Sequence, residues 1–175
     1  DGARVANAAA ALEVPLAAFT RDAGVDVLSF GGTKNGLMFG EAVVFFDPAL
    51  ARDFKFTRMQ GLQLASKMRF IGAQFEALLG GDLWLRNARN ANKMASLLAN
   101  LVRELPGVEI AHDPQVNAVF ARLAPAAAQR LRESYAFHTW DPAVNEVRWM
   151  CGFDATEADV RAFVEAVRQA VDQQQ

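Results

Sequence analysis

Lys34 is the residue of this sequence most readily assigned covalent chemistry. It follows a short apolar run at residues 25–30, which predicts a buried strand, and it lies between Gly31-Gly32 and Gly36. Glycines on both sides let the backbone approach a ligand closely. A lysine that is desolvated or set beside other cations becomes less basic, and its neutral amine can form a Schiff base. The alternative is that Asn35-Gly36 forms a hairpin turn and leaves Lys34 exposed.

The segment Asp1-Gly2-Ala3-Arg4 supplies a second pair of charged candidates. A carboxylate directly before a glycine, with a helix following at residues 5–12, can end a strand and point into a cleft. Open α/β sheets bind their ligands at the carboxyl ends of their strands. The alternative is that Asp1 caps the helix and Arg4 is a surface residue.

Arg148 is the third candidate. It lies between Val147 and Trp149 in a short apolar strand, where a guanidinium is costly unless it meets an anion. Its planar fork matches a carboxylate at two points. The alternative is an outward-facing arginine on an alternating strand.

The composition favours a soluble, globular and cytoplasmic protein and argues against several other classes. The 175 residues are 52% hydrophobic with a net charge of −2, and the basic residues form no stripe that would suit nucleic acid. No apolar run is long enough to cross a bilayer, and a single cysteine, Cys151, forms no internal disulfide. His112, His138 and Cys151 lack metal-ligand spacing, so no metal is expected.

The elements that must position these residues alternate between helix and strand. Apolar positions predict a helix over residues 66–79 and a long amphipathic helix from about residue 91 to 105. Strands are expected at 42–46, 108–111, 116–123, 135–140 and 146–150. Helices are expected at 126–134 and after Thr156, which together with Asp159 comes close to the capping-box pattern. Gly80-Gly81 is the clearest break, so we place the domain boundary between residues 1–80 and 81–175. The class is α/β in two layers.

Taken together and in this order, the three candidate segments resemble the low-specificity L-threonine aldolases. The resemblance rests on Asp1-Gly2-Ala3-Arg4 and residues 26–36, and it continues through residues 41–46, Ser66-Lys67-Met68-Arg69-Phe70 and Glu146-Val147-Arg148. It covers essentially the whole chain. It implies a fold-type I enzyme dependent on pyridoxal 5′-phosphate (PLP), with residues 1–80 in the PLP-binding large domain and 81–175 in a smaller α/β subdomain.

The resemblance also implies a role for each candidate. Lys34 would hold PLP as a Schiff base, Asp1 would pair with the pyridine nitrogen, and Arg4 would lie near the phenolic oxygen or the substrate. Arg148 would bind the substrate's α-carboxylate, and Arg69 would reach the cofactor phosphate of a neighbouring subunit. Two residues near Lys34 would assist it: Ser29 and Thr33.

The implied reaction is retro-aldol cleavage of threonine or allo-threonine to glycine and an aldehyde, in a homo-oligomer. In that family the phosphate loop, the stacking aromatic residue and the base precede the Asp-Gly-Ala-Arg segment. The chain opens at that segment without a methionine. We therefore expect it to be a C-terminal portion that holds PLP poorly by itself. The alternatives are another fold-type I enzyme, a β-eliminating lyase or aminotransferase, and a non-catalytic fragment.

Overall fold

The computed structural model describes residues 1–172 and forms two compact units, Asp1–Ala88 and the chain from Arg89 onward. The division falls inside the long helix α5 (Leu83–Arg103) and not at the 80/81 boundary expected from the glycines. Two side-chain hydrogen bonds explain the difference, because Asn35 and Asn87 tie the first turns of α5 to the first unit. The two units are described separately.

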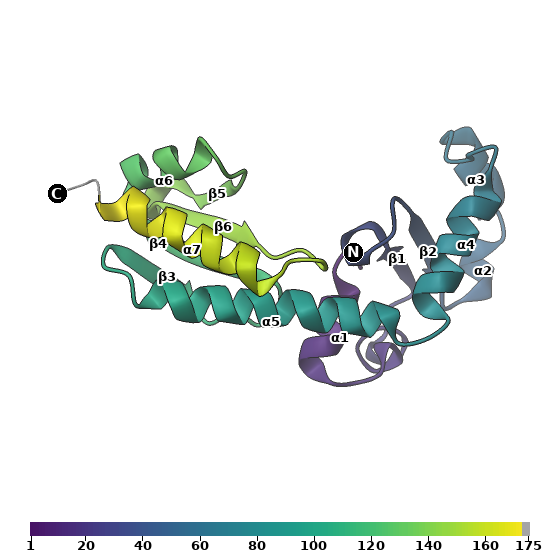
Figure 1. Ribbon diagram of the computed structural model, residues 1–175. Coiled ribbons are helices and arrows are strands. Elements are labelled where there is room, and N and C mark those ends of the chain that lie inside the picture. Colours follow the sequence, from purple (N-terminus) through teal and green to yellow (C-terminus); the bar gives the residue numbers. More distant parts are fainter. Residues whose placement is uncertain (173–175) are drawn as a thin grey trace. The chain divides into compact units, whose positions relative to one another are not determined.

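The first unit is built around a two-stranded antiparallel sheet, β1 (Val27–Gly31) and β2 (Glu41–Phe45), in which Leu28 pairs with Val44. Alternation along β1 turns Leu28 and Phe30 inward, where they pack with Val5 of α1. The other elements are short helices (Figure 1): α1 (Val5–Leu12), η1 (Leu16–Phe19), η2 (Arg21–Ala23), η3 (Thr33–Asn35), α2 (Pro48–Ala51), α3 (Phe54–Gln60) and α4 (Met68–Leu79).

Local signals account for several boundaries of these elements. The side chain of Asp47 accepts a hydrogen bond from the Ala49 amide at 2.9 Å, and Pro48 occupies the first turn, so these two residues start α2. Pro15 and Gly24 favour a single short helix that runs to about Asp22, but the structure forms two 3-10 turns there, η1 and η2.

The second unit is a four-stranded antiparallel sheet in the order β3-β4-β6-β5. Its strands and helices follow the end of α5: β3 (Val108–His112), β4 (Ala118–Leu123), α6 (Pro125–Arg132), β5 (His138–Asp141), η4 (Pro142–Val144), β6 (Glu146–Met150) and α7 (Glu157–Asp172). The strand and helix predictions for this region are confirmed to within a few residues.

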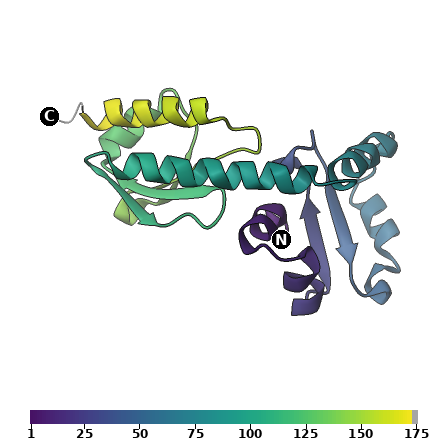
Figure 2. The ribbon, with the colours of Figure 1, turned by 60° about the horizontal axis from the view of Figure 1, so that its bottom comes forward.

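Helices α5, α6 and α7 cover one face of this sheet (Figures 1 and 2). The inward residues of β4 and β6, among them Val119 and Trp149, are almost fully buried against these helices. The side chains between them in sequence, such as Phe120 and Arg148, lie on the opposite face, which we call the open face.

The last helix shows the reciprocal cap that the sequence predicted. The Thr156 hydroxyl accepts from the Asp159 amide at 3.2 Å, and the Asp159 carboxylate accepts from the Thr156 amide at 2.9 Å. The Thr156 hydroxyl also donates to the Asp159 carboxylate at 2.6 Å, and this bond, together with that from the Thr156 amide, lowers the pKa of the Asp159 carboxyl. Among the helices formed by residues 1–172, none is both long and apolar enough to span a membrane.

Candidate active site

Backbone pairing fixes Asp1 beside strand β1. Gly2 forms a parallel bridge with Phe30, in which the Gly2 amide donates to the Ser29 carbonyl at 2.8 Å and the Gly31 amide donates to the Gly2 carbonyl at 3.3 Å. A Cβ on Gly2 would lie 2.6 Å from both the Ser29 oxygen and a Leu28 methyl, so only glycine permits this approach. Asp1 therefore lies next to the strand that leads to Lys34.

Asp1 and Arg4 line one pocket of about 410 Å³, together with residues of α1, η1 and β1. The Asp1 carboxylate accepts from the Ala3 amide at 2.8 Å, whereas the N-cap position of α1 is Arg4. Asp1 is thus not the N-cap that the alternative interpretation required. The structure brings together the acid and the arginine that the sequence singled out.

Lys34 is the middle residue of η3, a single helical turn that follows β1. The two-residue hairpin turn considered for Asn35-Gly36 does not form, since Asn35 ends η3 and the connection continues to Gly40. Gly36, with a φ of 120°, then reverses the chain, a conformation that favours glycine. Lys34 itself is exposed in this chain, as the turn alternative also expected.

Asn35 anchors this turn and was not recognised from the sequence. Its side chain is 3% exposed and donates to the Trp84 carbonyl at 3.0 Å, while Asn87 donates to the Asn35 carbonyl at 2.8 Å. The Thr33 hydroxyl accepts from the Gly40 amide at 3.1 Å and closes the other side of the loop. The sequence gives no sign of this role beyond the residue type itself. A buried asparagine needs hydrogen-bond partners, and here they come from positions far along the chain.

The remaining candidates of the first unit lie near this sheet or on α4. The Ser29 hydroxyl donates to the Glu41 carboxylate at 3.4 Å across the β1–β2 pair. Arg69 is exposed in the first turn of α4, with its guanidinium carbon 4.9 Å from the ring centre of Phe70.

Arg148 lies in the second unit, on the open face of the sheet. It is half-buried, with its guanidinium carbon 4.8 Å from the ring centre of Trp140. Its Nε atom is buried and has no hydrogen-bond partner among residues 1–172. Arg148 also lines a pocket of about 390 Å³ whose wall includes two more basic side chains, Arg132 and His138. Such a pocket favours an anion.

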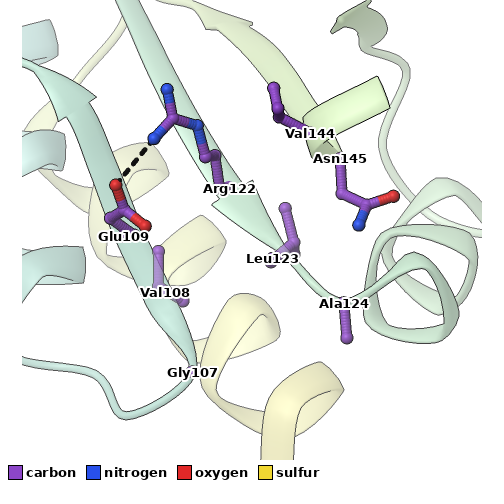
Figure 3. A pocket seen from close by; sticks show the side chains of 8 residues that line it. All are labelled: Gly107, Val108, Glu109, Arg122, Leu123, Ala124, Val144 and Asn145. Atoms are coloured by element: carbon purple, nitrogen blue, oxygen red, sulfur yellow. Dashed lines mark hydrogen bonds and ion pairs between the residues drawn. The ribbon is translucent and has the colours of Figure 1, made fainter. Parts of the chain in front are cut away.

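A second arginine of the open face, Arg122, is engaged by carboxylates. It contacts Glu109 at 2.8 Å and the buried Glu146 at 3.2 Å, and it lines a pocket of about 490 Å³ between β3, β4 and η4 (Figure 3). None of the residues predicted from the sequence to act in catalysis lines that pocket. Cys151 is buried, and burial raises the pKa of its thiol to about 11.

The chemistry of the first unit's residues fits PLP. A lysine amine follows β1, a carboxylate is held on the neighbouring backbone segment, and glycine at position 2 keeps the two segments close. PLP offers an aldehyde that a lysine amine can bind and a ring nitrogen that a carboxylate can keep protonated.

Comparison with known proteins agrees with these features. The family model described as β-eliminating lyase matches residues 1–126. Low specificity L-threonine aldolases from Pseudomonas sp. (strain NCIMB 10558) and Pseudomonas aeruginosa are each 44% identical to the chain, over 96% of its length and 49% of theirs. The chain thus spans about half the length of the curated relatives it matches.

Two solved structures are similar in fold. Threonine aldolase from Leishmania major superposes with a TM-score of 0.84 at 28% identity, covering 98% of this chain and 51% of that one. The glycine decarboxylase (P-protein) of the glycine cleavage system has a TM-score of 0.51 at 20% identity, over 82% of this chain and 35% of that one, and this likeness concerns the fold alone. The predicted α/β fold of the fold-type I PLP enzymes is confirmed.

Proposed function

Because this chain belongs to the β-eliminating lyase family, we propose that the protein carrying it is a PLP-dependent aldehyde-lyase that cleaves β-hydroxy-α-amino acids, L-threonine and L-allo-threonine, to glycine and an aldehyde. The identity to low specificity L-threonine aldolases over nearly the whole chain supports this substrate class. The observation that carries the proposal is the backbone bridge between Gly2 and Phe30, which holds an acid beside the strand that precedes Lys34.

The residues of the first unit bind and tune the cofactor in this proposal. Lys34 holds PLP through its amine, and the Asp1 carboxylate keeps a proton on the pyridine nitrogen. When bound, PLP accepts the electron pair released as the Cα–Cβ bond of the substrate breaks. Arg4 lines the same pocket as Asp1 and contacts the cofactor's phenolic oxygen or the substrate. Thr33 fixes the loop that presents Lys34, through its bond to the Gly40 amide.

Two arginines bind anionic groups in this proposal. Arg148 binds the α-carboxylate of the substrate and so orients the bond to be cleaved, which its buried and unpartnered Nε supports. Arg69 is exposed at the start of α4 and reaches the cofactor phosphate of a neighbouring subunit.

Borohydride reduction of the full-length protein with PLP, followed by peptide mass mapping, tests the assignment of Lys34. The mass of the reduced cofactor is expected on the peptide that contains Lys34. Lys34→Ala should abolish this label, whereas Lys93→Ala, which removes an exposed lysine from α5, should leave it. A label on another lysine would overturn the assignment and favour the exposed-turn alternative.

Product analysis separates the lyase from its sister enzymes. With L-threonine, the proposed reaction releases acetaldehyde and glycine in equal amounts, whereas β-elimination or transamination yields a keto acid. Accumulation of a keto acid without an aldehyde would refute retro-aldol cleavage and leave the cofactor assignment standing.

The proposal extends to a homo-oligomer, a dimer or tetramer, located in the cytoplasm. Large apolar side chains of the first unit are exposed in this chain, including Leu62 at 88% and Met38 at 82%. A subunit contact would bury such side chains. A full-length protein that light scattering finds to be monomeric would contradict the oligomer.

A further inference from the structure

Two arginines of the open face differ in their partners. Strand alternation places Arg122 and Arg148 on the same face, because Arg122 pairs with Glu146 and Phe120 pairs with Arg148 in the β4–β6 register. Arg122 contacts two carboxylates, Glu109 and Glu146. Among the ion pairs formed by residues 1–172, none includes Arg148. The charge of Arg148 is therefore available to an anionic ligand.

An aromatic ring takes the place of a carboxylate beside Arg148. The guanidinium carbon lies 4.8 Å from the ring centre of Trp140 on the neighbouring strand β5. The Trp140 ring is itself held by Phe120, at 5.2 Å between ring centres in an edge-to-face arrangement. Trp140 is 54% exposed, so its ring contributes little to the buried core of this unit.

A ring above the guanidinium restrains it without using its hydrogen-bond donors. The five N–H groups of an arginine are its hydrogen-bond donors, and the attraction to the π-face of the indole pairs none of them with an oxygen acceptor. A carboxylate partner would instead occupy the donors that a ligand needs. The contact with Trp140 can thus restrain the guanidinium while its donors stay unpaired with any carboxylate of residues 1–172.

We propose that Trp140 is a positioning residue that orients the guanidinium of Arg148 toward the carboxylate of the amino-acid substrate. This inference rests on the proposed function, in which Arg148 binds that carboxylate. Trp140 contacts the arginine but does not line the pocket that Arg148 lines, so its effect on binding should pass through Arg148.

A double-mutant cycle in the full-length holoenzyme tests this dependence. Trp140→Ala should raise KM for L-threonine about 3- to 10-fold, with a smaller change in kcat, since exposed cation–π contacts contribute modestly. Trp140→Phe retains an aromatic face and should recover most of the loss. In an Arg148→Ala background, Trp140→Ala should change KM by less than about twofold, because the interaction is already absent. Val144→Ala, in the exposed η4 turn, is the matched control.

The outcomes separate this inference from the proposed function. If Arg148→Ala raises KM and Trp140→Ala does not, Trp140 does not position the arginine and the inference alone is refuted. An equal effect of Trp140→Ala with and without Arg148 would also refute it, since the ring would then act by another route. If Arg148→Ala leaves KM unchanged while L-threonine is still cleaved, the role of Arg148 fails and the inference fails with it.

Discussion

Replacement of Asn35 by alanine should loosen the turn that carries Lys34. The side chain is 3% exposed, and its amide donates to the Trp84 carbonyl at 3.0 Å. The substitution removes that bond and leaves the reciprocal one, from Asn87 to the Asn35 carbonyl, in place. The turn η3 therefore loses one of its two attachments to the start of α5.

The free-energy cost of Asn35→Ala depends on which hydrogen-bonding groups keep a partner after the substitution. A typical hydrogen bond contributes about 0.5–1.5 kcal/mol net, and a buried group left without its partner adds about 1–3 kcal/mol. Trp84 lies in the first turn of α5, where its carbonyl also accepts the helix's own bond, so the second cost is near its lower limit. The Asn35 Oδ1 atom is buried without a partner, and its removal offsets part of the loss. The net destabilisation of the turn is about 1–2 kcal/mol.

Amide hydrogen exchange in the full-length protein measures this quantity locally. Peptides covering residues 31–40 should exchange roughly 5- to 30-fold faster in Asn35→Ala, the factor that corresponds to 1–2 kcal/mol. Asn87→Ala should accelerate the same peptides. Asn100→Ala, at an exposed position of the same helix, should leave them unchanged. Unaltered exchange in Asn35→Ala, or equal acceleration in Asn100→Ala, would refute the role of this anchor.

Three other substitutions test separate parts of the structure. Gly2→Ala places a Cβ 2.6 Å from the Ser29 oxygen, so it should lower stability by about 1–3 kcal/mol and weaken PLP binding, as a cofactor titration would show. Thr156→Ala removes half of the capping box of α7 and should cost about 1 kcal/mol in urea unfolding. Burial raises the thiol pKa of Cys151 from 9.0 to about 11, so stability should fall by about 2 kcal/mol as the pH rises from about 9 to 11, where the unfolded thiol ionises first. Unfolding curves of Cys151→Ala over the same pH range should lack this decline.

Elements with a strong local pattern could be predicted from the sequence. The apolar period of α5 and the cap formed by Thr156 and Asp159 each depend on residues within a few positions of one another. Strand β6 was predicted with its observed bounds, residues 146–150, because its apolar residues alternate.

The details of the candidate site depend on contacts distant in sequence. Asn35-Gly36 has the composition of a two-residue turn. The Asn35 side chain is instead buried and donates a hydrogen bond to the carbonyl of Trp84, 49 residues away. The contact of Trp140 with Arg148 depends on the β5–β6 register and on an irregularity between Thr139 and Asp141. Local propensity carries no information about such partners.

Because Gly2 is bridged to Phe30, the position of Asp1 beside β1 does not depend on how many residues separate the two in the sequence. Main-chain hydrogen bonds keep the two segments adjacent, whatever the length of the segment that follows α1 and leads to β1. Doubling such a connection costs only about 0.6 kcal/mol in closure entropy. Insertions near Val14 or Gly24 should therefore be tolerated, and related proteins can carry the same acid and lysine at different separations along their sequences.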